Sequence, residues 1–209
     1  MANLRLSRLT LLAVVTTLCA VVAAAATPSA KAGLFGCGPG SQPFASVDGD
    51  TTTYYAMPNG GFEAGSAGWS LSGGAALISG NEPWSVSGGS RSLYLPSGSS
   101  ARGPKTCLAL LSPVLRMFAT DAGGTDGGLR VTIEYRSLLG SLLGISSYTT
   151  FAPADYQEWQ PTERVRIPVG ALGGVPLATA YFQMRLTPLG PGSKWQVDDV
   201  FVDPFLNGM

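Results

Sequence analysis

The chain has 209 residues, 13 basic and 13 acidic side chains, and no histidine. The absence of histidine excludes Ser-His-Asp and Cys-His catalytic centres and histidine-ligated zinc, and the chain has no glycine-rich phosphate loop or dinucleotide-binding motif. Charged residues make up only 12% of the chain and glycine accounts for 28 residues, a composition typical of strands joined by many tight turns.

The first 32 residues have the pattern of a secretory leader. Arg5 and Arg8 precede an apolar run over residues 9–26, and Ala30-Lys31-Ala32 satisfies a small-x-small cleavage pattern. We therefore expect a signal peptide at 1–32 and a secreted protein.

Two alternatives for this segment stay open: cleavage after Ala26, or an uncleaved anchor, because the apolar run is long enough to span a bilayer. Without residues 1–32 the chain has ten basic and thirteen acidic residues, a net charge of −3. This balance offers no basic surface for nucleic acid or anionic lipid.

Residues 33–56 are rich in glycine, proline and serine, which predicts an irregular N-terminal arm. Outside the leader the chain has two cysteines, Cys37 and Cys107. In a secreted protein we expect them to form a disulfide, which would tether the arm to the domain. The alternative is that one of them is a free, activated thiol.

From residue 57 onward, short runs of β-forming residues are separated by turn residues. The alternation of apolar and polar residues is clearest in Leu129-Arg130-Val131-Thr132-Ile133-Glu134-Tyr135-Arg136. Candidate strands are 61–63, 69–72, 75–78, 92–95, 105–110, 114–120, 129–137, 147–151, 162–169, 180–186 and 195–202. No helical period persists over eleven residues, so we predict one all-β sandwich domain at 57–209.

A local repeat, Leu138-Leu139-Gly140-Ser141-Leu142-Leu143-Gly144, predicts a hairpin. Gly140-Ser141 fits a two-residue type II′ turn, in which glycine supplies the positive φ of the first position. We expect the paired leucines to pack on the inner face of the sandwich. The alternative is an exposed apolar tip that meets a partner.

Two short signatures lie at opposite ends of this domain. The first is Asn59-Gly60-Gly61-Phe62-Glu63 with Gly68-Trp69 shortly after, and the second is Trp195-Gln196-Val197-Asp198-Asp199-Val200. Together they resemble the galactose-binding-like jelly rolls, especially the carbohydrate-binding modules appended to xylanases and β-glucanases. The resemblance covers residues 57–205 and implies a jelly-roll β-sandwich whose first and last strands are neighbours.

The same resemblance implies a structural Ca²⁺ held by Glu63 and by one of Asp198 or Asp199, near the turn at 88–91. Ca²⁺ takes about six to eight oxygen ligands from carboxylates and backbone carbonyls. In the alternative without a metal, one aspartate accepts backbone amides, the other points to solvent, and Glu63 pairs with an arginine.

Sugar sites on such sandwiches stack the apolar face of a pyranose on an aromatic ring, while polar groups bond its rim. Trp84 and Trp159 lie in loop-like segments beside Asn81 and Gln157, and we predict that these four residues contact a neutral glycan. For either tryptophan, burial in the core is the alternative. The aromatic residues that sit within strand patterns are expected in the core: Phe62, Trp69, Tyr135, Phe182 and Trp195.

These patterns predict a secreted, non-catalytic module that binds a carbohydrate or cell-surface glycan, does not bind nucleic acid and does not stay inserted in a membrane after signal cleavage. One alternative is a structural or cell-surface β-sandwich protein without a small ligand. Another is a small glycoside hydrolase, for which the acids around Trp159, namely Asp155, Glu158 and Glu163, are the candidates.

Overall fold

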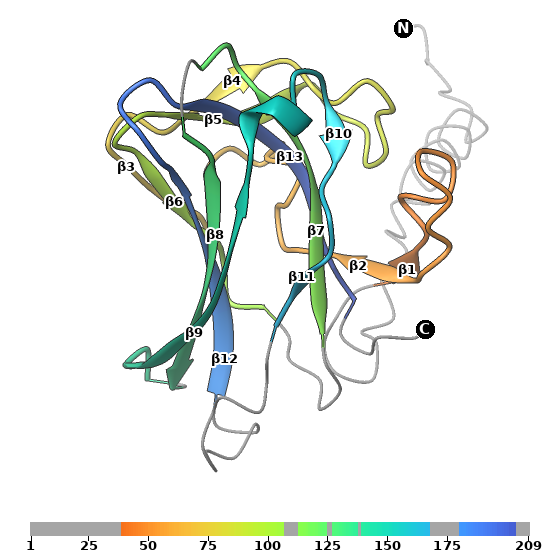
Figure 1. The fold of residues 1–209 in the computed structure, drawn as a ribbon. Helices are drawn as coiled ribbons and strands as arrows, with labels where there is room; N and C mark the ends of the chain where they lie inside the picture. Colours follow the sequence, from red (N-terminus) through yellow and green to blue (C-terminus); the bar gives the residue numbers. More distant parts are fainter. Residues whose placement is uncertain (1–38, 107–112, 125–126, 138, 168–179, 204–209) are drawn as a thin grey trace, which may run out of the picture. The chain divides into compact units, whose positions relative to one another are not determined.

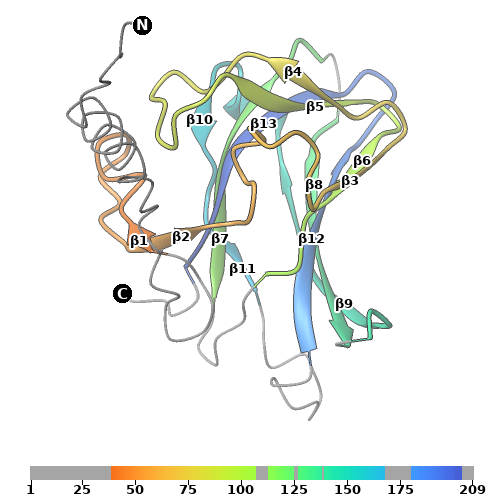
Figure 2. The same cartoon turned by 180° about the vertical axis from the view of Figure 1, so that it is seen from behind.

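The computed structural model describes residues 39–106, 113–124, 127–137, 139–167 and 180–203. They form two antiparallel β-sheets packed face to face, together with one 3₁₀ turn, η1 (Pro153–Asp155). Figure 1 shows the two layers, and Figure 2 shows them from behind. The predicted all-β jelly-roll sandwich is confirmed. No helix among these residues is long and apolar enough to cross a membrane.

The strands divide between the sheets as follows. Sheet A contains β1 (Gly40–Ser41), β2 (Tyr54–Ala56), β4 (Ala76–Ser79), β5 (Arg91–Pro96), β7 (Val114–Asp121), β10 (Gln160–Pro161), β11 (Val165–Arg166) and β13 (Lys194–Asp203). Sheet B contains β3 (Ser70–Ser72), β6 (Ser100–Arg102), β12 (Ala180–Pro188), β8 (Leu129–Ser137) and β9 (Leu142–Phe151), in that spatial order. Within sheet A, β13 pairs with β2 and β5 along one edge and with β7 along the other.

The alternating pattern of residues 129–136 produces β8. Val131, Ile133 and Tyr135 are buried against sheet A, whereas Arg130 and Thr132 lie on the opposite face. The pairing of β8 with β12 continues this alternation across the whole length of β12. One face of sheet B is therefore apolar and the other is polar, as the period of two requires.

The main core lies between the two sheets. All five aromatic residues predicted for the core are buried, with exposed fractions from 0% to 6%: Phe62, Trp69, Tyr135, Phe182 and Trp195. The indole nitrogens of two of them have partners: Trp69 Nε1 donates to the carbonyl of Asn59, and Trp195 Nε1 to Ser193 Oγ. Both indoles are thus buried without leaving an unpaired donor.

The segment expected to be an irregular arm contributes two strands to sheet A. Residues of β2 pair with Phe201 and Val202 of β13, and β1 pairs with β2. Between these strands, Phe44 packs on Phe118 and Phe201 in a second aromatic cluster on the outer face of sheet A, together with Tyr54 and Val114. This part of the arm is therefore integral to the sandwich, because it covers apolar residues that would otherwise face water.

Two local predictions are wrong. Residues 61–63 are a turn and not a strand, since Asn59 and Phe62 have φ values of 52° and 59°. In the 138–144 hairpin, Ser137 pairs with Ser141, and Gly140 (φ 90°) is the last residue of the loop instead of the first of a two-residue turn.

The leucines of this hairpin are exposed and do not pack inside. Leu139, Leu142 and Leu143 are 96%, 50% and 42% exposed, and Ile145 is 59% exposed. β9 is the edge strand of sheet B, and the end of the hairpin lies at the margin of the sandwich (Figure 1). Leu138, Cys37, Cys107 and the leader 1–32 lie outside the described residues.

Candidate functional site

The loop over residues 80–90, between β4 and β5, is ordered from within by a buried carboxylate. Glu82 is 1% exposed, and its Oε2 and Oε1 accept the amides of Trp84 and Val86, both at 2.5 Å. Its own amide donates to Asp198 Oδ2 of β13 at 3.3 Å. This loop therefore holds a fixed conformation against sheet A, even though its outer residues are exposed.

Trp84 lies on the outer side of this loop. Its indole is 41% exposed and rests on Phe118 with ring centroids 5.3 Å apart. It lines a pocket of about 520 Å³ together with Ser41, Gln42, Ser85 and other residues of the arm and loop. The pocket thus combines an aromatic face with hydroxyl and amide groups, which is the chemistry that a sugar ring requires.

The other three residues predicted for a glycan site lie elsewhere. Trp159 is half-buried against the second aromatic cluster, the one that also supports Trp84. Gln157 is exposed and donates to the carbonyl of Pro153 at 2.8 Å. The side-chain amide atoms of Asn81 are buried and have no hydrogen-bond partner among the described residues, so this side chain does not face the pocket.

A β-bulge in β13 buries two neighbouring aspartates. The register with β7 shifts between Asp198 and Phe201, and Asp199 has a φ of 46°, a left-handed conformation that aspartate tolerates. As a result Asp198 and Asp199 are 0% and 1% exposed, although successive residues of a regular strand point to opposite faces. The bulge places both carboxylates beneath the loop over residues 80–90.

Each of the three predicted metal ligands accepts backbone amides. Glu63 Oε1 accepts those of Ser90 and Arg91 at 2.8 Å, and Asp199 Oδ2 accepts that of Ser87 at 2.9 Å. Glu63 and Asp199 therefore both bond the loop at 87–91, next to the turn at 88–91 that the family resemblance implied. Asp198 turns instead toward residue 82.

Two details expected for a site without a metal differ in the structure. Both aspartates are buried, and Glu63 accepts the amide of Arg91 and forms no ion pair among the described residues.

The buried carboxylates lack a cationic partner. Burial raises the pKa of Asp198 to about 8, and the neighbouring charge of Asp199 adds to this rise. Burial also raises the pKa of Asp199 to about 6, against the lowering effect of its bonds to Ser87. No lysine or arginine within the described ranges forms an ion pair with Glu82, Asp198 or Asp199.

A metal at this position would have an incomplete set of carboxylate ligands. In the part of the chain that the structure describes, no three Asp, Glu, His or Cys side chains are grouped so that they could hold a metal ion. Asp199 Oδ1 and Asn81 Oδ1 are nevertheless among the buried side-chain oxygens of the described residues that accept no hydrogen bond. A hard cation fits the charge and the oxygen chemistry here, and backbone carbonyls would have to complete its coordination.

Glu82, which orders the Trp84 loop, is not among the site residues predicted from the sequence. The bonds of its carboxylate to the amides of Trp84 and Val86 are local and follow the turn at residues 82–86, whereas the bond of its own amide to Asp198, 116 positions away, depends on the fold. The three acids considered for a hydrolase, Asp155, Glu158 and Glu163, are all exposed. Glu163 lines an open pocket of about 460 Å³ beside Arg164, whose guanidinium pairs with Asp50.

Comparisons with known proteins give the following. No protein-family model matches the chain, and no curated protein matches it. Among solved structures it is similar to TmCBM61 in complex with beta-1,4-galactotriose, with 14% identity over 71% of this chain and 97% of that one, at a TM-score of 0.45. It is similar to the CBM22-1 xylan-binding domain of Paenibacillus barcinonensis Xyn10C, with 12% identity over 65% and 84% of the chains, at a TM-score of 0.42.

It is also similar to the C-terminal family 22 carbohydrate binding module of Clostridium thermocellum Xyn10B. The identity is 12% over 71% of this chain and 94% of that one, at a TM-score of 0.45.

Proposed function

We propose that this chain is a secreted, non-catalytic β-sandwich protein that binds a neutral glycan in the Trp84 pocket. The observation that carries this proposal is an indole 41% exposed over a pocket of about 520 Å³ with polar walls. An exposed indole that is held in place by packing from below can stack on a sugar ring with little loss of side-chain conformational entropy on binding.

Two features keep the indole in place. Phe118 supports the ring from below, and Glu82 fixes the backbone on both sides of it through the amides of Trp84 and Val86. Stacking on one indole together with a few neutral hydrogen bonds corresponds to weak binding, with Kd values of about 1 μM to 1 mM. Since the attraction is not ionic, binding should change little with salt.

The test is a retention assay on a panel of insoluble polysaccharides, followed by calorimetric titration with the oligosaccharide of any that retain the protein. Trp84→Ala should abolish most of the binding and leave the melting temperature nearly unchanged. Leu139→Ala, which removes an exposed apolar side chain in the turn between β8 and β9, is the matched control and should bind normally.

Four results would contradict the proposal in different ways. Unfolding of Trp84→Ala would make Trp84 a core residue. Normal retention of that variant would place the ligand elsewhere. If no polysaccharide retains the wild-type protein, the alternative of a structural protein without a small ligand applies. Hydrolysis of a retained glycan would contradict the non-catalytic part of the proposal.

We also propose that Ca²⁺ binds beneath the loop over residues 80–90, with Asp199 and Glu63 among its ligands. Support comes from the buried Asp199 Oδ1, which accepts no hydrogen bond, and from the buried carboxyl group of Asp198 beside it, which forms no ion pair with a described residue. At a Ca²⁺ concentration about 100 times Kd, the ion would stabilise the fold by about 2.7 kcal/mol, or roughly 5–10 °C in melting temperature.

Melting in millimolar Ca²⁺ and in chelator measures this effect. Asp199→Asn should remove the difference, whereas Asp155→Asn, at an exposed position, should keep it. Equal melting temperatures in Ca²⁺ and chelator for the wild-type protein would refute the cation site without affecting the glycan proposal.

A further inference from the structure

The charges of the molecule are distributed unevenly between the two sheets. The five strands of sheet B contain four arginines and one glutamate: Arg102, Arg130, Arg136, Arg185 and Glu134. The chain from residue 33 onward has a net charge of −3. Because the inner face of sheet B is apolar, these charged residues lie on its outer face, which is therefore positive on an acidic protein.

Three of the arginines converge on one carboxylate. Glu134 on β8 has a side chain only 3% exposed, and it pairs with Arg136 Nη2 at 2.6 Å. Arg185 Nε on β12 donates to Glu134 Oε1 at 2.6 Å, and Arg102 Nε on β6 lies 3.1 Å from Oε2. Three guanidinium groups thus share a single negative charge, which leaves two positive charges in excess within this cluster.

The ionised carboxylate holds the arginines in position. Burial opposes ionisation of Glu134, but the bonds from Arg136 and Arg185 outweigh it and lower its pKa. Arg102 Nε is buried and contacts Glu134 as an ion pair without a hydrogen bond, so the part of the Arg102 guanidinium that a ligand can reach is its outer end. The side chains of Arg102 and Arg185 are 32% and 35% exposed.

A small cavity adjoins these two arginines. It measures about 160 Å³ and is lined by Arg102 and Arg185 together with hydroxyl and apolar groups of Ser70, Leu71, Ser72 and Ser100. The register explains this grouping, because Arg102 lies opposite Ser70 on one side and Arg185 on the other. Guanidinium forks beside hydroxyl groups can bind a carboxylate and the hydroxyls of the ring that bears it.

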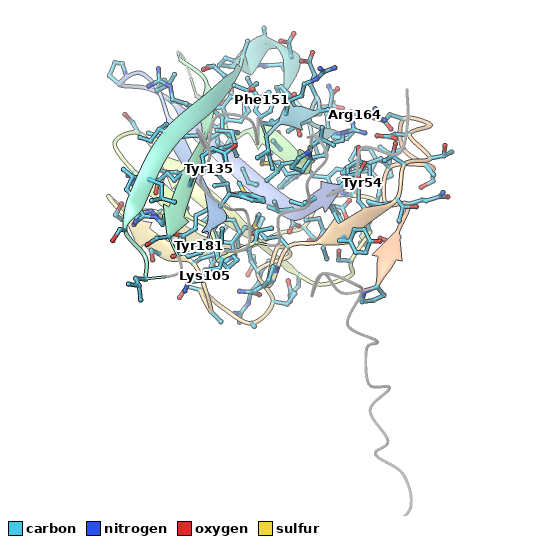
Figure 3. All side chains as sticks on the ribbon, turned by 90° about the horizontal axis from the view of Figure 1, so that it is seen from below. Tyr54, Lys105, Tyr135, Phe151, Arg164 and Tyr181 are labelled. Atoms are coloured by element: carbon cyan, nitrogen blue, oxygen red, sulfur yellow. The ribbon has the colours of Figure 1, made fainter. Side chains whose placement is uncertain are left out.

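We propose that the outer face of sheet B binds a polysaccharide that carries carboxylate groups, with Arg102 and Arg185 contacting the acidic group. Tyr181 is the aromatic residue among the described side chains of this face. Lys105 Nζ lies over its ring, 4.6 Å from the ring centroid (Figure 3). Nucleobases need an open ring for stacking, so the face favours an acidic glycan over single-stranded nucleic acid. This site is separate from the Trp84 pocket, which lies on sheet A and the arm.

The experiment is calorimetric titration with polygalacturonate and with its fully methyl-esterified form, which has the same backbone without the charges. The wild-type protein should bind the acidic form and not the ester. The binding should weaken strongly between about 50 mM and 500 mM NaCl, because the attraction is ionic. Sulfated polysaccharide serves as a second acidic probe and should bind more weakly, if sugar carboxylate is the group recognised.

Arg102→Gln and Arg185→Gln should each weaken binding of polygalacturonate about tenfold or more, since each removes charge-assisted hydrogen bonds. Arg91→Gln is the matched control: it removes the same charge from an exposed position on β5 of sheet A, and it should bind normally. Trp84→Ala should also bind polygalacturonate normally, which separates this proposal from the neutral-glycan proposal.

Several results would overturn the proposal. Equal binding of the acidic and esterified polymers would remove the role of charge. An equal loss in Arg91→Gln and Arg102→Gln would show a non-specific effect of net charge. A single-stranded oligonucleotide bound more tightly than polygalacturonate, and lost in the same two variants, would assign the face to nucleic acid instead. Retained binding in both sheet B variants, with unchanged melting temperatures, would place the ligand elsewhere.

Discussion

At the scale of single residues, the neighbouring aspartates of β13 are the least conventional feature. Asp198 and Asp199 are both buried, because the bulge between residues 198 and 201 turns Asp199 inward as well. A buried carboxylate without a cation favours its protonated form. These two side chains therefore couple the stability of the fold to pH and to any cation that reaches them.

The pH dependence of stability has a definite direction. The pKa values of Asp198 and Asp199 are raised to about 8 and about 6 from 3.8, so the folded protein holds protons that the unfolded chain has released. The free energy of unfolding should then fall as pH rises through this range. In chelator, we expect a lower melting temperature at pH 8 than at pH 5 by calorimetry.

Asp198→Asn should flatten this slope, because the amide does not titrate, and Ca²⁺ should flatten it in the wild-type protein by stabilising the charged form. Asp155→Asn, at an exposed position, should leave the slope unchanged. A melting temperature that rises steadily from pH 5 to pH 8 in chelator would contradict this account.

At the scale of elements, the N-terminal arm is held by a buried ion-pair network as well as by its strands. Arg116 on β7 is 5% exposed; its Nη1 pairs with Asp50 at 2.7 Å and its Nε donates to the carbonyl of Thr162 at 2.7 Å. Its Nη2 pairs with Asp48, and its guanidinium lies over the ring of Phe44, 4.1 Å from the centroid. The loop between β1 and β2 is thereby attached to the middle of sheet A.

Removing this arginine should detach the arm. Arg116→Met keeps the apolar stem but leaves Asp50 with Arg164 as its remaining cation and the carbonyl of Thr162 without its donor. We expect a loss of about 3–5 kcal/mol in the free energy of unfolding by urea titration. Limited proteolysis should also cut the 42–53 segment faster.

Arg166→Met, which removes an arginine from an exposed position on β11, is the control and should change neither measurement beyond about 0.5 kcal/mol. Slow proteolysis of the 42–53 segment in Arg116→Met would show that the strand pairing holds the arm without the ion pairs.

The elements differ in how well the sequence predicts them. The period of two in residues 129–136 is a local signal, and it predicts β8 and the buried face of sheet B correctly. Tyr55 of β2 pairs with Val202, almost 150 positions away, so the composition of residues 33–56 does not predict this strand. The predicted burial of the hairpin leucines is wrong for a related reason. Their hydrophobicity does not show whether the opposite sheet extends far enough to cover them.

The candidate sites show the same division. The exposure of Trp84 follows from its Asn-Glu-Pro loop and could be predicted from the sequence. The approach of Glu63 and Asp199 to one loop came only from the family resemblance, because it depends on the pairing of distant segments. The convergence of arginines on Glu134 could not, since it requires the register of β6, β12 and β8 side by side. From the sequence alone, each of these arginines is expected to be an isolated, solvent-exposed residue on the polar face of its strand.

At the scale of the whole molecule, secretion and the disulfide stay predictions, because the leader and both cysteines lie outside the described residues. We expect the exported protein to begin at Gly33 and to contain a Cys37–Cys107 bond. Intact mass of exported material, with and without reduction and alkylation, measures both. Two alkylated cysteines without prior reduction would contradict the disulfide, and retention of the apolar run would favour an anchor.

The strands of sheet B contain four arginines but only one of the thirteen acidic residues, and the other acids lie outside these strands, so the net charge differs between the two sides of the sandwich and gives the molecule an electric dipole moment. Two proteins with the same net charge but different dipoles behave differently near a charged surface. This one should align in the field of an anionic matrix with sheet B foremost. A negatively charged resin at neutral pH should therefore retard a protein whose net charge would predict repulsion, and the orientation would present the arginine cluster before any other part of the molecule.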